Sequence, residues 1–340
     1  MVEKFKSLSK CKVIVLIVLP IIIGFLALCI GRYMISPKEV LDVLLQQFFG
    51  MNVEVPDVHL SVVWNVRLPR ILLALLVGMG LSISGAAFQS LFSNPLATPD
   101  TLGVAAGASF GAALGILLFD SIVVVQMLSI VFGIVAVGLT YSISKVKGKS
   151  TILMVVLGGM VTSAFFQALI SLIKYVADPE TKLPAITYWL MGSMASVSYK
   201  VLLGGAPLML IGIIILYLLR WRFNILALSE DEARTMGYNL QHMRWLVILA
   251  STAITASAVS MCGQIGWIGL LIPHITRMLV GTNNQKVIPV SISLGACYMV
   301  IIDTVARSAS TAEIPLSILT ALIGAPFFGY LLRKTGGGWA

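Results

Sequence analysis

The sequence predicts an all-α integral membrane protein of ten transmembrane helices, built as two inverted five-helix halves with both termini in the cytoplasm. Composition, recurring apolar runs and the distribution of charge carry this prediction. Of the 340 residues, 58% are hydrophobic and 11% are charged, whereas a soluble domain carries roughly a quarter charged residues. Such a chain cannot cover its surface with polar groups. Composition therefore excludes a soluble enzyme, a disulfide-stapled secreted domain and a disordered chain, and we treat residues 1–340 as one transmembrane domain.

Apolar runs recur along the chain, separated by short polar breaks. The first, 13–31, follows four lysines and imitates a signal peptide, but its 19 residues can span the membrane and no small-x-small cleavage site follows it. We expect a retained first helix. The other nine runs lie near 71–92, 101–119, 121–144, 151–173, 201–219, 245–262, 265–280, 287–306 and 314–332. Lipid leaves unpaired backbone groups without partners, and barrel-type alternation is absent, so each run is expected to be a helix.

The charge distribution orients these spans. The net charge of +9 could suggest nucleic acid, but the cations follow the membrane topology and no nucleic-acid partner is expected. With a cytoplasmic N-terminus, 15 of the 23 Lys and Arg residues fall on the inner side and 8 on the outer side. The positive-inside rule then puts both termini in the cytoplasm. Orientation does not explain the outer-side arginines Arg67, Arg70 and Arg307.

A weak internal repeat suggests the two halves. At a constant offset of 178, five residues recur: Ser82, Gly85, Pro95, Thr98 and Gly103 match Ser260, Gly263, Pro273, Thr276 and Gly281. Five spans lie between Gly85 and Gly263. Because five is an odd number, equivalent segments would run in opposite directions, as in transporters with inverted repeats.

Two kinds of chemistry are not expected of this chain. The four cysteines and three histidines are scattered, so we expect no metal site and interpret the cysteines as buried apolar side chains. Gly148-Lys149-Ser150-Thr151 resembles the end of a phosphate-binding loop, but Ile143 stands where that pattern needs glycine. If transport uses ATP, another subunit supplies it.

The longest inner loop, 220–244, contains a short helix signal. Ser229 is a good N-cap, acidic residues fill the first turn, and Gly237 supplies a C-terminal stop. This predicts an amphipathic helix on the cytoplasmic face. The alternative is a solvated helix that only links two spans.

Several segments, in order along the chain, resemble the FecCD family of ABC-transporter permeases. They are Arg67-Leu68-Pro69-Arg70, Ser84–Gln89, Asn94–Asp100, the acidic loop, Gly263–Arg277, Asp303–Arg307, Glu313-Ile314-Pro315 and Leu322–Phe328. The resemblance runs from about Arg67 to Lys334. No single segment is specific for this family, but the whole set, in this order and topology, is.

The resemblance implies a permease of the bacterial cytoplasmic membrane, a transport subunit and not an enzyme, working as a homodimer or close heterodimer. Two cytoplasmic ABC ATPase subunits and an extracytoplasmic substrate-binding protein would complete the importer. This chain would bind no cofactor, with ATP and Mg held by the ATPases. The residues expected to couple it to them are Glu230, Asp231, Glu232, Ala233 and Gly237.

The resemblance also offers a role for the outer arginines. Arg67, Arg70 and Arg307 match positions that meet acidic residues of the binding protein, and a guanidinium can hold a carboxylate in two hydrogen bonds. The alternatives are interfacial anchoring for Arg67 and Arg70, and an i,i+4 pair with Asp303 for Arg307.

Gly158, Gly159, Ser163 and Gln167, on the 151–173 run, could line a translocation pathway; close helix packing is the alternative. Ferric siderophores are the expected cargo, with haem and cobalamin behind. An ion-coupled secondary transporter would need a carboxylate inside the membrane, and only Asp303 lies well within a span.

Overall fold

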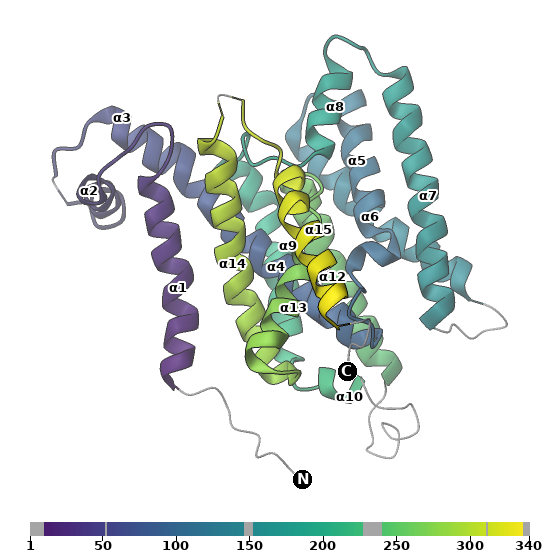
Figure 1. Ribbon diagram of the computed structural model, residues 1–340. Helices are drawn as coiled ribbons and strands as arrows, with labels where there is room; N and C mark the ends of the chain where they lie inside the picture. Colours follow the sequence, from purple (N-terminus) through teal and green to yellow (C-terminus); the bar gives the residue numbers. More distant parts are fainter. Residues whose placement is uncertain (1–9, 52, 146–151, 227–239, 311, 336–340) are drawn as a thin grey trace.

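The structure is a computed structural model and describes residues 10–51, 53–145, 152–226, 240–310 and 312–335. Regular structure within these ranges is entirely helical (Figure 1). Each of the ten predicted apolar runs coincides with a helix: α1 (Lys10–Cys29), α4 (Leu68–Leu91), α5 (Val104–Leu118), α6 (Ile122–Ser144), α7 (Ile152–Val176), α9 (Tyr199–Leu218), α12 (Leu240–Cys262), α13 (Ile268–Val280), α14 (Asn284–Ser308) and α15 (Leu316–Thr335). The all-helical membrane prediction is confirmed.

The ten helices differ in length. Within the described ranges, seven helical segments are long and apolar enough to cross a membrane, and α5, α13 and the described part of α15 are shorter apolar helices. A span of the hydrocarbon core takes about 20 residues. The count of ten crossings therefore remains a prediction. In Figure 1, the N-terminal end of α1 and the C-terminal end of α15 lie on the same side of the bundle.

Within the described residues, six further elements were not predicted as helices. They are α2 (Pro37–Phe49), α3 (Asp57–Leu60), the π-helical turn η1 (Ser61–Arg67), the 3-10 turn η2 (Pro99–Leu102), α8 (Lys182–Leu190) and α10 (Phe223–Leu226). Helix α2 had a readable signal. Ser36 and Glu39 form a capping box, Pro37 occupies the first turn, and Gly50 ends the helix in the left-handed conformation. With α3, it forms the arm at the left of Figure 1.

Helices α4 and α12 form the centre of the bundle. Each is a span of which 78% is buried, more than any other, and they pack against one another. Helix α4 also packs on α13 and α14, while α12 packs on α5 and α6. Each central helix therefore contacts the two helices that follow its counterpart in the chain. This reciprocal packing is what two inverted halves would produce.

The register of the halves differs from the one predicted at offset 178. Gly85 lies inside α4, whereas Gly263 follows the end of α12. Pro95 lies outside the helices, whereas Pro273 lies within α13. These two residue pairs therefore have different structural surroundings, and the division into inverted halves remains a prediction. Small residues recur wherever helices cross closely in lipid, so chance matches at one offset are common.

Glycines allow α4 to approach its neighbours. A Cβ on Gly78 would collide with the backbone carbonyl of Gly295 on α14, and a Cβ on Gly85 with that of Gly269 on α13. Backbone-to-backbone contact of this kind is the packing expected of membrane helices, where lipid gives side chains no hydrophobic reason to associate.

Candidate functional site

The predicted docking arginines lie together near the C-terminal end of α1, the end predicted to face outward. The last carbonyl groups of a helix have no hydrogen-bond donor inside the helix. In α1, each of the carbonyls described below accepts a hydrogen bond from another group. The carbonyl of Leu26 accepts from the Ile30 amide at 3.1 Å and that of Cys29 from the Ile35 amide at 3.2 Å. Arg67 donates to Leu28 at 2.6 Å, and Arg307 donates to Ala27.

These two guanidinium groups cap the C-terminal end of α1, a role that residues next to a helix end usually fill. Helix α1 has no basic residue in its last turn, where a positive charge stabilises the negative end of the helix dipole. Arg67 comes from the end of η1 and Arg307 from the last turn of α14. The two groups are neighbours, since Nη2 of Arg67 and Nη1 of Arg307 both lie within 2.9 Å of the position of a Cβ on Gly31.

Arg70 is the centre of a buried ion-pair network. Its Nε lies 2.9 and 3.0 Å from the two carboxylate oxygens of Asp303, and its Nη1 lies 2.8 Å from Glu313. Asp303 is 1% exposed and also faces Arg307 at 3.7 Å, the i,i+4 pair predicted as an alternative. The network joins the start of α4 to the C-terminal end of α14 and to the α14–α15 link.

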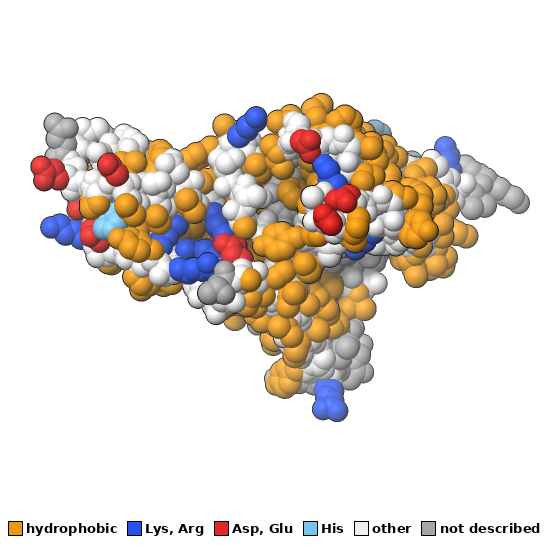
Figure 2. Space-filling model, turned by 90° about the horizontal axis from the view of Figure 1, so that it is seen from above, with side chains coloured by type: hydrophobic (Ala, Val, Ile, Leu, Met, Phe, Trp, Pro, Cys, Tyr) orange, Lys and Arg blue, Asp and Glu red, His pale blue; other side chains and the backbone are white. Residues whose placement is uncertain are grey.

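The three arginines are therefore internal in this chain: Arg67 and Arg70 are 5% exposed and Arg307 is 8% exposed. Seen from above, basic and acidic side chains gather where the left-hand arm meets the rest of the molecule (Figure 2). A docking group would need free donors for a partner's carboxylate. The contacts of these arginines favour a structural role, and docking remains a prediction.

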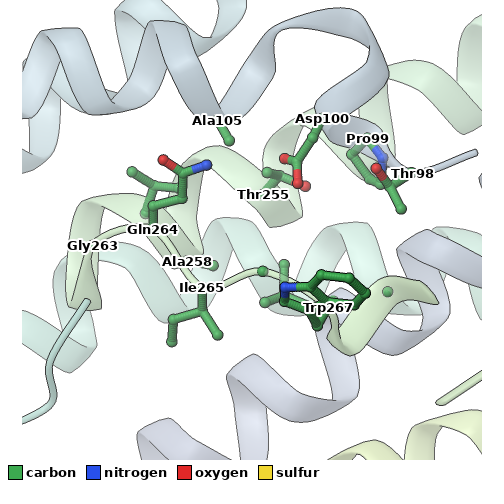
Figure 3. A pocket seen from close by; sticks show the side chains of 14 residues that line it. Thr98, Pro99, Asp100, Ala105, Thr255, Ala258, Gly263, Gln264, Ile265 and Trp267 are labelled. Atoms are coloured by element: carbon green, nitrogen blue, oxygen red, sulfur yellow. The ribbon is translucent and has the colours of Figure 1, made fainter. Parts of the chain in front are cut away.

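Two breaks in the helices face each other near the centre of the bundle. The first is the 92–103 segment between α4 and α5; the second is 263–267, between α12 and α13. They enclose a cavity of about 30 Å³ whose lining includes Thr98, Asp100, Thr255, Gln264 and Trp267. Figure 3 shows the Asp100 side chain pointing into this cavity beside Thr255. The cavity thus lies where the two irregular segments meet.

The second break carries an unusual backbone. Trp267 has a φ of 70°, which a bulky residue adopts only at a cost of about 1–3 kcal/mol. A Cβ on Gly324 of α15 would come within 2.8 Å of the Trp267 side chain, so α15 holds this residue in place. Strain of this kind, beside a cavity, marks the α12–α13 break as a candidate moving part. Sequence reasoning did not find it, because a tryptophan gives no signal for a left-handed conformation.

The four predicted pathway residues, all on α7, have different surroundings. A Cβ on Gly159 would collide with the backbone carbonyl of Thr101 in η2, and a Cβ on Gly158 would collide with Ser144 of α6. Both glycines are packing positions. Ser163 is half-buried near Gly103, whereas Gln167 is exposed on the chain surface. The structure thus leaves Gln167 as the member of the set that is open to a pathway.

The proposed coupling residues, Glu230, Asp231, Glu232, Ala233 and Gly237, lie outside the described residues. The described beginning of their loop is firmly attached. Asn224 of α10 donates to the Asn283 side chain at 3.1 Å and accepts from the Asn284 amide at 3.0 Å. Asn284 in turn accepts from Ser90, near the C-terminal end of α4, at 3.1 Å. A displacement of the loop would therefore be transmitted to α14 and α4.

The described residues contain no group of three His, Cys, Asp or Glu side chains placed to hold a metal ion. Cys29, Cys262 and Cys297 are free and buried, as their interpretation as small apolar side chains predicts.

Comparison with known proteins identifies the chain's relatives. A profile of the FecCD transport family matches residues 18–334. The chain is 44% identical to a molybdate import system permease protein of Haemophilus influenzae, over 94% of each chain. It is 38% identical to a protein of Helicobacter pylori described as an iron chelatin transport permease, over 93% of this chain and 96% of that one. A solved structure, described as a metal-chelate type ABC transporter in an inward-facing conformation, matches with a TM-score of 0.85 and 42% identity, over 95% of this chain and 99% of that one.

Proposed function

The chain belongs to the FecCD transport family and is the permease subunit of an ABC importer, and we propose that its cargo is molybdate. The observation that supports this cargo is the 44% identity to a molybdate import permease along 94% of both chains. The second candidate is a ferric siderophore, the cargo expected from the sequence. It is supported by the 38% identity to the permease described for iron chelatin. Haem and cobalamin follow, since more distant relatives carry those names.

We propose that two copies of the permease, or this chain and a close relative, form the pathway in the bacterial cytoplasmic membrane. Two ATPase subunits would bind the 220–244 loop from the cytoplasm through Glu230, Asp231, Glu232, Ala233 and Gly237. The attachment of Asn224 to α14 supports this role, because a coupling element must move its spans as a rigid unit. A substrate-binding protein would deliver cargo to the outer face. ATP and Mg would bind the ATPases, and this chain would carry no cofactor.

An ion-coupled secondary transporter gains no support from the geometry. Such a transporter needs a membrane carboxylate that can gain and lose an ion. Asp303 is instead held by two hydrogen bonds from Arg70 and lies 3.7 Å from Arg307. A carboxylate fixed between two guanidinium groups is a structural ion pair.

Uptake into proteoliposomes tests the cargo. The permease is reconstituted with its ATPase and binding protein, and ATP-dependent accumulation of radioactive molybdate and of radioactive iron in a ferric siderophore is compared. We expect molybdate to accumulate and excess unlabelled tungstate, a close chemical analogue, to suppress its uptake. Accumulation of iron without molybdate would show that the cargo is a ferric siderophore and not molybdate. Uptake of neither would overturn both cargo assignments while leaving family membership intact.

A further inference from the structure

A large groove opens on the side of the bundle along the inner half of α1. Its volume is about 1160 Å³, slightly above the roughly 300–1,000 Å³ typical of ligand pockets. Its walls are aliphatic, with Ile17 and Ile21 from α1, Leu75 and Met79 from α4, and Ile292 from α14. The importer function described above makes no use of this groove.

The groove exists because α1 packs closely on the bundle from its middle to its C-terminal end, and less closely before that. Ala27, Leu28 and Cys29, in the last turn, are at most 7% exposed, and the carbonyls of Ala27 and Leu28 accept hydrogen bonds from the two arginines. Farther from that end, Ile17 and Ile21 are 59% and 64% exposed. The inner half of α1 therefore stands away from its neighbours at the edge of the bundle (Figure 1), and its side chains need an apolar partner.

Two cations line the groove: Arg220, just beyond α9, and Lys286, in the first turn of α14. Both are half-buried, and within the described ranges neither is paired with a carboxylate. The first turn of α14 contains no acidic residue, so the positive end of its dipole reinforces Lys286. Tyr217 and Trp221 also line the groove, and such aromatic residues belong at the depth of the lipid headgroups.

We propose that this groove binds an anionic phospholipid of the inner leaflet, with one acyl chain along α1 and the phosphate between Arg220 and Lys286. The charges and the walls both favour this ligand. A phosphate accepts hydrogen bonds from a guanidinium and an ammonium at once. The aliphatic walls offer no partners to a peptide backbone, and an acyl chain requires none. Basic pockets between helices on the cytoplasmic side are the usual sites of anionic headgroups.

Arg220 is already oriented for this contact. Its guanidinium carbon lies 4.2 Å from the centre of the Tyr217 ring, and Nη1 donates to the Tyr217 carbonyl at 3.0 Å. These two contacts fix the side chain, and a guanidinium has five N–H donors, so donors remain for a phosphate.

Native mass spectrometry of the purified full-length chain tests the proposal. The protein is titrated with phosphatidylglycerol or with phosphatidylcholine of the same acyl chains, and bound lipid is counted. The test variant is Arg220→Gln/Lys286→Gln. The matched control, Lys174→Gln/Lys200→Gln, removes two cations that do not line the groove. Each basic residue near the membrane surface contributes about 1 kcal/mol toward an anionic lipid, so we expect the test variant to lose about thirtyfold in phosphatidylglycerol affinity. The control and phosphatidylcholine binding should not change.

Glycerol phosphate, added at the same concentration, separates the headgroup from the whole lipid. We expect it neither to bind detectably nor to compete, because the acyl chain supplies most of the contact. Equal affinity for the two lipids, or equal loss in the test and control variants, would overturn the proposal. Strong competition by glycerol phosphate would show a plain phosphate site instead. All of these readings are independent of cargo and of ATP hydrolysis.

Discussion

The guanidinium of Arg67 donates a hydrogen bond to the carbonyl oxygen of Leu28, 2.6 Å away and 39 residues earlier in the chain. Together with the bond from Arg307 to Ala27, it caps the C-terminal end of α1. Arg67 and Arg307, which the sequence predicted to dock the binding protein, thus cap the C-terminal end of a helix. This changes what substitution of these arginines should do.

Removal of Arg67 should loosen the end of α1. In Arg67→Met, the carbonyls of Leu28 and Tyr33 lose their donor, which costs about 1–3 kcal/mol for buried groups. Cys29 lies at the loosened end, so we expect its labelling by a maleimide to accelerate several-fold while that of buried Cys262 does not. If Arg67 serves docking alone, Cys29 labelling will be unchanged and only stimulation by the binding protein will fall.

Removal of Arg70 should be far more costly. Arg70→Met leaves the buried Asp303 with only the more distant Arg307, and breaking a buried ion pair from one side costs about 3–5 kcal/mol. We expect a marked loss of folded protein by size-exclusion chromatography in detergent, partly restored by adding Asp303→Asn. Lys182→Met is the control, because it breaks an exposed pair with Asp120 and should cost under about 1 kcal/mol. Similar losses in the two single variants would contradict the assignment.

The pathway residues on α7 should separate into two groups. In Gly159→Ala, the added methyl meets the Thr101 carbonyl, and overpacking costs about 1–3 kcal/mol. Thermal unfolding should detect this loss. Gln167→Leu should retain stability and reduce uptake, as expected for an exposed pathway position. Gly138→Ala serves as control, because nothing lies near its added methyl. Unchanged stability in Gly159→Ala would restore Gly159 as a pathway candidate.

The attachment of the inner loop predicts an uncoupled variant. Asn224→Ala removes both contacts to Asn283 and Asn284 without altering the loop's acidic residues. We expect the complex to assemble and hydrolyse ATP, but to move several-fold less cargo for each ATP consumed. Gln285→Ala, a change of an exposed side chain in the same turn of α14, should behave as wild type. A wild-type transport ratio in Asn224→Ala would show that the loop transmits motion by another route.

The sequence was most informative where one physical effect dominates. All ten apolar runs are helices because lipid permits little else. The arm formed by α2 escaped detection, although Ser36, Pro37 and Glu39 give a helix start, because its apolar stripe is too short for a span. Arg70 and Asp303 stand 233 positions apart, and nothing local predicts their pairing. A burial-dependent contact of that kind emerges only when α4 and α14 are placed side by side.

ATP hydrolysis by the reconstituted importer tests the central claim most directly. The chain is combined with its ATPase, with and without the binding protein, and Glu232→Arg is measured in parallel. We expect the binding protein to stimulate hydrolysis several-fold and Glu232→Arg to prevent assembly with the ATPase. Cargo movement by the chain without any ATPase, unaffected by Glu232→Arg, would contradict the account.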